Sequence, residues 1–112
     1  DAGVPLAFGS DFPVESVDPR LGLRAAITRQ DAEGKPAHGW FASERVTAYE
    51  ALRGFTADAA WAGFAETEVG MLRPGLRADF VVLDADPLEQ RPAGIAVLDV
   101  YVDGVRAARP GG

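Results

Sequence analysis

The sequence contains no cysteine, a single histidine (His38) and a single lysine (Lys35) among its 112 residues. The lack of cysteine excludes disulfide bonds, thiolate nucleophiles and cysteine-based zinc sites together. One histidine cannot supply the several protein ligands of a catalytic zinc site. With one lysine, the chain also lacks a polybasic patch for an anionic membrane surface.

Long apolar runs are missing as well. No stretch approaches the ~20 residues of a membrane-spanning helix, so we expect no membrane partner. The first residues have neither the basic nor the apolar region of a signal peptide, and we expect a cytoplasmic protein. The chain opens on Asp1-Ala2-Gly3, without a starting methionine, and leads straight into an apolar run. We therefore interpret the sequence as a part of a longer protein.

What the chain does contain is typical of a folded globular domain. Its 47% hydrophobic and 25% charged residues lie in the ordinary range. The 17 acidic and 11 basic residues give a net charge of −6, and no basic run offsets it. Nucleic acid is therefore excluded as an expected partner. The length suits one modest core but falls short of a whole enzyme barrel.

The first part of the chain predicts a strand followed by helices. Residues 4–8 form a short apolar run between glycines, which favours a strand. Asp18-Pro19 is a helix-start signal, and the helix should continue to about Gln30. Thr47 and Glu50 fit a capping box that opens a second helix through position 52. Thr56 is expected to cap a third helix over residues 57–62.

The second part predicts an all-β structure. Residues 80–83, Phe-Val-Val-Leu, form an uninterrupted apolar run, expected to be a strand buried on both faces. Residues 97–102 alternate in polarity, and residues 105–108 are expected to return as their partner strand. Asp103-Gly104 between them is a strong signal for a two-residue hairpin turn. We expect a boundary between the two parts near residue 64.

Four segments resemble known motifs in a fixed order. Gly9-Ser10-Asp11-Phe12-Pro13 looks like the segment that ends the last barrel strand of the amidohydrolase superfamily. Residues 50–60 are similar to that family's helix pair, and residues 70–84 to its signature ending in Ala-Asp-Phe-Val-Val-Leu-Asp. Within the superfamily, the segments Ser-Asp-Phe-Pro-Val and Ala-Ala-Ile-Thr-Arg point to amidohydrolase family 3. Leu76 departs from the pattern, which usually has lysine there.

This resemblance implies an α+β fragment of a larger fold. Residues 1–64 would hold the final βα unit of a (β/α)8 TIM barrel and its following helices. Residues 65–112 would form the C-terminal part of an antiparallel or mixed β-sandwich domain. The parent would be a metal-dependent hydrolase of non-peptide C–N bonds, acting on a small molecule through a metal-activated water. A non-catalytic descendant of the fold and an unrelated α+β domain are the alternatives.

Asp11 is the candidate catalytic residue. Carried over from the family, it would be a metal ligand that also accepts a proton from the attacking water. The residues agree, because Asp11 follows the predicted strand at its C-terminal end, where barrel active sites lie. The resemblance implies a divalent metal in the parent, with zinc expected, and no metal held tightly by this chain alone. We expect the isolated chain to be inactive and to self-associate through its exposed barrel-strand edges.

The remaining candidates have mainly structural interpretations. His38 is expected in a solvated loop, with a substrate-entrance contact or a metal ligand as alternatives. Trp40 and Phe41 are expected to be half-buried anchors of their loop, with the lining of a substrate entrance as the alternative, and Trp61 is expected in the core. Asp79 is expected in the turn that enters a strand, and Asp84, Asp86 and Glu89 are expected to be exposed turn acids, with a cation site as the alternative. Arg29 and Arg53 are expected to pair with carboxylates.

Overall fold

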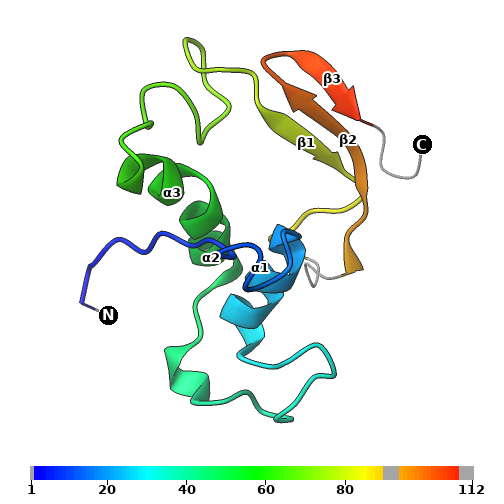
Figure 1. Ribbon diagram of the computed structural model, residues 1–112. Coiled ribbons are helices and arrows are strands. Elements are labelled where there is room, and N and C mark those ends of the chain that lie inside the picture. The colour runs from blue at the N-terminus through cyan, green and yellow to red at the C-terminus, as the bar shows by residue number, and fades with distance from the viewer. Residues whose placement is uncertain (1, 90–93, 109–112) are drawn as a thin grey trace.

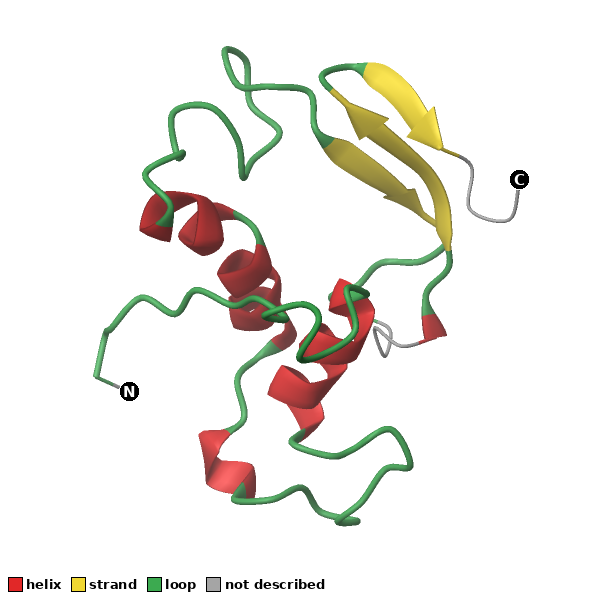
Figure 2. Cartoon of the chain, in the orientation of Figure 1, coloured by secondary structure: helices red, strands yellow, loops and turns green. Residues whose placement is uncertain are grey.

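A computed structural model of the protein describes residues 2–89 and 94–108 (Figure 1). The elements in chain order are α1 (Pro19–Thr28), the 3-10 helix η1 (Ala42–Glu44), α2 (Ala48–Phe55), α3 (Ala57–Ala62), β1 (Phe80–Leu83), β2 (Val97–Val102) and β3 (Val105–Ala108). The helices gather at one end of the molecule and the sheet stands at the other (Figure 2). The expected α+β composition is confirmed. Within residues 2–89 and 94–108, no helix has the length and apolarity needed to cross a membrane.

The helices begin where the sequence predicted. Asp18 caps α1 by accepting from the Arg20 N–H, with Pro19 at the first position, and Thr47 and Glu50 form the expected capping box of α2. Helix α1 ends two residues earlier than predicted, because Arg29 adopts a left-handed conformation with φ of 52°. Helix α3 has the predicted bounds but not the predicted cap. Its Thr56 hydroxyl donates back to the Leu52 carbonyl at 2.7 Å instead.

The core is small and made of small side chains. Ala51 is 0% exposed, Ala60 9% and Ile95 3%. Gly54 is buried too, and its Cα faces the ring of Phe8, where an added Cβ would collide. Trp61, expected in the core, is 55% exposed, so that prediction is wrong.

The sheet is antiparallel, with the order β1-β2-β3. Phe80 pairs with Tyr101, and their rings stack with centroids 4.6 Å apart. The expected hairpin turn is confirmed, since Asp103 and Gly104 both have positive φ, 52° and 75°. The predicted burial of β1 on both faces is wrong: Val81 is 50% exposed. Three strands without a second layer leave both faces open within the described residues.

The strand predicted at residues 4–8 does not form in this chain. Residues 2–10 form no strand in the structure. They run instead along α2, where the Phe8 N–H donates to the Gly54 carbonyl at 2.8 Å and the Phe8 ring lies 5.4 Å from that of Phe55 (Figure 1). A strand takes its hydrogen bonds from a neighbouring strand. The structure shows none beside this segment in the part of the chain that it describes.

Candidate active site

Asp11 lies in a tight turn directly after the segment that runs along α2. Its carbonyl accepts the Val14 N–H at 2.9 Å, and its φ is 51°. Aspartate tolerates this left-handed region better than most residues. The peptide between Phe12 and Pro13 in the same turn is cis. The Asp11 side chain is exposed, so its carboxylate is free to meet a ligand or a further part of the protein.

The described residues do not form a complete metal centre. Across residues 2–89 and 94–108, no three side chains of His, Cys, Asp or Glu lie close enough together to hold a metal ion. A catalytic zinc site usually has about three protein ligands. A metal site that included Asp11 would therefore need its other ligands from outside the described residues.

The other acidic and basic candidates have structural partners. Asp79 accepts the Asp103 N–H at 2.7 Å and so secures the hairpin turn, as expected of a turn residue. In the 84–89 cluster, Asp84 accepts the Ala96 N–H and Asp86 the Leu88 N–H, both at 2.8 Å. Asp86 therefore stabilises a local turn, and Asp84 joins the end of β1 to the segment before β2. The exposed His38 lies in the loop between α1 and η1, as expected.

The loop aromatics are held differently from the prediction. Trp40 and Phe41 are 62% and 64% exposed, more than the half-buried anchors that we expected. Their rings meet edge to face at 4.7 Å. Arg29 lies 5.1 Å from the Trp40 ring centroid and donates to the Trp40 carbonyl at 2.5 Å. The expected carboxylate partner of Arg29 is thus wrong, since a ring face and a carbonyl hold this guanidinium.

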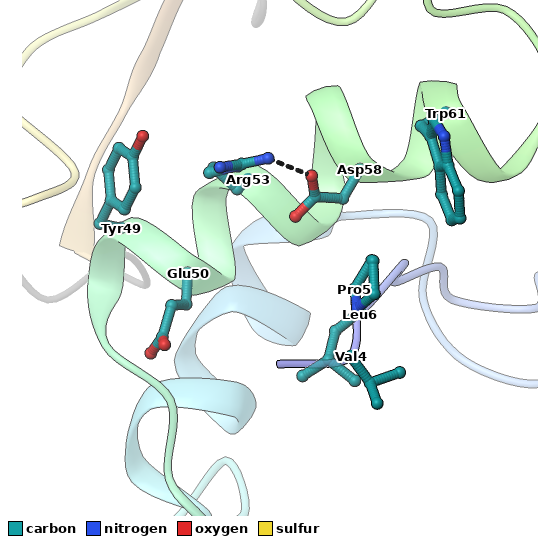
Figure 3. A pocket seen from close by; sticks show the side chains of 8 residues that line it. All are labelled: Val4, Pro5, Leu6, Tyr49, Glu50, Arg53, Asp58 and Trp61. Carbon is teal, nitrogen blue, oxygen red and sulfur yellow. Dashed lines mark hydrogen bonds and ion pairs between the residues drawn. The ribbon is translucent and has the colours of Figure 1, made fainter. Parts of the chain in front are cut away.

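A hollow of about 390 Å³ lies between the N-terminal segment and helices α2 and α3 (Figure 3). Val4, Pro5 and Leu6 form one wall. Opposite them stand Tyr49 and Glu50 of α2, Trp61 of α3 and the ion pair of Arg53 with Asp58, whose nitrogen and oxygen are 2.6 Å apart. The expected carboxylate partner of Arg53 is confirmed, and this hydrogen bond raises the pKa of Arg53.

A second hollow, of about 470 Å³, lies beside the turn that holds Asp11. Residues 9–10 and 15–16 form one side of it, and α1 with residues 30–32 forms the other. Its polar lining includes Ser10, Glu15 and Arg24, and its apolar lining includes Leu21 and Phe55. Asp11 itself is not among the lining residues. No sequence motif predicts this hollow, because its walls come from segments that only the fold brings together.

Arg20 is a residue that the sequence reasoning missed. Its guanidinium binds the Asp18 carboxylate with two hydrogen bonds, from Nη2 to Oδ2 at 2.6 Å and from Nε to Oδ1 at 2.9 Å. The side-chain hydrogen bond from Arg20 lowers the pKa of Asp18, helped by the Arg20 backbone N–H and the positive charge. The remaining nitrogen, Nη1, donates to the Ile95 carbonyl at 2.8 Å, across 75 positions of sequence. Nothing in the local pattern predicts that contact.

Comparison with known proteins identifies the fold and the family. The family model described as "Amidohydrolase family" matches residues 1–108. A putative amidohydrolase of Bacillus subtilis is 35% identical over 88% of this chain and 18% of its own length. An N-substituted formamide deformylase of Arthrobacter pascens is 37% identical over 94% of this chain and 19% of its own. The chain therefore spans under a fifth of these relatives.

A solved structure has the same fold. The crystal structure of an amidohydrolase from Thermotoga maritima superposes with a TM-score of 0.72 at 24% identity, over 96% of this chain and 24% of the other. The resemblance of residues 9–13, 50–60 and 70–84 thus agrees with a match along nearly the whole sequence. This chain belongs to the amidohydrolase family.

Proposed function

We propose that Asp11 is an active-site carboxylate of a metal-dependent hydrolase that cleaves non-peptide C–N bonds. The observation that carries the proposal is its position: an exposed carboxylate in a tight turn at the end of a Gly-Ser-Asp segment. Membership of the amidohydrolase family supports a hydrolase. The similarity to an N-substituted formamide deformylase supports the C–N bond as the target.

In this proposal, Asp11 has two tasks. Its carboxylate supplies one ligand to a divalent metal ion, zinc by our expectation, with the other ligands from outside the described residues. When bound, such an ion lowers the pKa of water in its site to about 7. The second task of Asp11 is to accept a proton, since general bases act from within hydrogen-bond reach of the proton they take. The exposed position of the carboxylate is compatible with both tasks.

The proposal for the fold follows from the division of the molecule into a helical part and a sheet. Residues 1–64 would complete a TIM barrel with the segment before Asp11 as its last strand, and residues 65–112 would belong to a β-sandwich. Two features favour this assignment. The N-terminal segment has the composition of a strand but no strand beside it among residues 2–89 and 94–108, and the sheet has open apolar faces that a second sheet would cover.

The test is Asp11→Asn in a full-length protein that contains this sequence, assayed on N-substituted formamides. Asparagine keeps the size and one oxygen donor but loses the charge and the capacity to accept the proton. We expect kcat to fall at least ~10²-fold with metal restored, the lower end of what a general base contributes. The thermal midpoint of the metal-replete protein should change little, because asparagine keeps the size of the side chain and removes a charge that is costly to bury. Metal content is measured in parallel, since the ligand role predicts a lower metal content.

Asp86→Asn is the matched control, because Asp86 is also an exposed turn aspartate. It should leave kcat within about twofold, as surface changes away from a site usually do. If metal-replete Asp11→Asn retains the wild-type kcat, Asp11 is not the base.

A further inference from the structure

We propose that Arg20 is a positioning residue that fixes the Asp11 turn, residues 11–17, against the sheet-bearing half of the molecule. The proposal gives Arg20 no contact with a substrate. Its value for catalysis rests on the function proposed for Asp11, but the structural link can be measured without any activity.

A series of hydrogen bonds leads from the Asp11 turn to Arg20. The Val14 N–H closes the turn on the Asp11 carbonyl at 2.9 Å. Further along, the Asp18 N–H donates to the Ser16 hydroxyl at 3.2 Å. The Asp18 side chain then accepts both the Arg20 N–H, at 3.0 Å, and the guanidinium. The end of the turn is therefore bound to the main chain of Asp18, and the carboxylate of the same residue caps α1 and binds the Arg20 guanidinium.

The second step is the geometry of the guanidinium. Nε and Nη2 bind the two oxygens of Asp18, which leaves Nη1 directed at the Ile95 carbonyl, 2.8 Å away. Arginine presents its donors in a rigid planar fork, whereas lysine has one flexible ammonium group. A lysine could pair with Asp18 or reach Ile95, but it could not hold both in fixed relative positions. Arg20 thus makes a three-point link that its closest chemical substitute cannot make.

The third step is the place where the link ends. Ile95 is 3% exposed, the most buried side chain outside the helices in the part of the chain that the structure describes. It lies two residues before β2, and the Ala96 N–H after it is bound by Asp84, which follows β1. The Ile95 carbonyl that accepts from Nη1 therefore belongs to a backbone segment that is fixed between the end of β1 and the start of β2. A hydrogen bond there ties α1 to the sheet.

A purely local role is the alternative. Asp18 and Arg20 are two positions apart, and their side chains are 30% and 37% exposed. An exposed pair of this kind contributes little to stability. We therefore expect the link to affect where the turn lies more than how stable the fold is.

The test is amide hydrogen exchange on the 112-residue chain, comparing wild type with Arg20→Lys. We expect the Asp18 and Val14 amides to exchange at least ~10-fold faster in the variant. The buried Ala51 amide of α2, which donates to the Thr47 carbonyl at 2.9 Å, should change less than about twofold. Arg24→Lys is the matched control, because Arg24 lies on the same helix and donates locally to the Ala32 carbonyl.

Two outcomes would overturn the proposal. Unchanged exchange in the turn would mean that Arg20 does not hold it. Equal acceleration at Ala51 would mean that Arg20 supports the whole fold and has no positioning role. If Arg20→Lys does not fold, Asp18→Asn replaces it, since this variant keeps an oxygen for the Arg20 N–H but weakens the grip on the guanidinium. The exchange rates of the turn amides and of the Ala51 amide are then compared in the same way.

The catalytic consequence is tested separately in the full-length protein. Arg20→Lys should lower kcat about tenfold with KM nearly unchanged, since small displacements of a reacting group reduce the rate. If Asp11→Asn has shown that Asp11 is not catalytic, the exchange result still decides the structural link. If Asp11 is catalytic and the turn loosens without any loss of kcat, Arg20 is not a positioning residue for the reaction.

Discussion

Two apolar runs of similar length have different structures in this protein. Residues 80–83 become β1, whereas residues 4–8 form no strand. The first run finds β2 as an antiparallel partner, with Val81 opposite Val100. In the part of the chain that the structure describes, the second run packs on helices, and the Phe8 N–H donates to the Gly54 carbonyl of α2. Apolar composition alone does not make a strand, because the strand's hydrogen bonds need a neighbour.

The two runs also need different things from the rest of the protein. β1 has its hydrogen bonds but lacks cover, since Val81 and Val82 are 50% and 38% exposed. The N-terminal run has a packing partner in Phe55 but lacks a strand neighbour. Both deficits would be met by the barrel and the sandwich that we propose. The predictions below test the difference between the runs in order of decreasing expected effect.

A pair of proline substitutions should show the largest difference between the two runs. Val100→Pro removes an N–H from the central strand β2 and should lower the free energy of unfolding by about 2 kcal/mol or more. Ala7→Pro should change it by no more than about 0.5 kcal/mol, because no strand ladder is lost there. Urea denaturation of both variants gives the two values. Equal losses would show that residues 4–8 are paired as a strand in solution.

Gly54→Ala tests the packing that replaces strand pairing in the N-terminal run. An added Cβ would collide with the Phe8 ring. Overpacking typically costs about 1–3 kcal/mol, and the better helix propensity of alanine offsets up to about 1 kcal/mol of it. We expect a net loss of about 1 kcal/mol in the free energy of unfolding, measured in urea. Gly9→Ala is the control, because nothing lies within 4 Å of its added Cβ. A stabilised Gly54→Ala would mean that the run does not rest on α2.

Acid should weaken the caps of α1 and α2, and this is the smallest of the expected effects. Hydrogen bonds from Arg20 lower the pKa of Asp18 below its usual 3.8, and hydrogen bonds from Thr47 lower the pKa of Glu50 below its usual 4.5. The folded state therefore binds these protons less readily than the unfolded state. Their contribution to stability is complete above pH 4.5 and is lost as the pH falls through the lowered values.

Circular dichroism at the helix band, followed from pH 7 to pH 3, would measure this loss. Asp18→Asn and Glu50→Gln should each flatten the acid limb, because neither amide titrates. An unchanged acid limb in both variants would show that these two caps do not set the pH dependence.

The features that were predicted correctly from sequence are those with local causes. The capping box of Thr47 and Glu50 spans four positions, and the Asp103-Gly104 turn spans two, so both could be recognised directly. The end of α1 was placed two residues too late, because the left-handed backbone of Arg29 depends on contacts with the following loop. Exposure was predicted least well. Trp61 and Val81 have the composition of core residues, but their burial requires elements that the pattern cannot supply.

The candidate site followed a similar rule. Asp11 was found through a resemblance over short segments, whereas an aspartate after an apolar run carries little information by itself. The contact of Arg20 with Ile95 could not be predicted, since 75 positions separate the two residues. The hollow beside the turn was missed for the same reason. Its lining residues belong to separate segments that have no common sequence motif.

The backbone of Asp11 has a consequence for mutagenesis by library and selection. With φ at 51°, the position favours glycine, asparagine and aspartate, and it disfavours β-branched residues whatever their chemistry. A saturation library at this codon would therefore lose valine and isoleucine clones for conformational reasons. Glycine and asparagine clones pass that filter, so their survival or loss reports on the carboxylate alone. The informative substitutions at this position are the ones that the backbone permits.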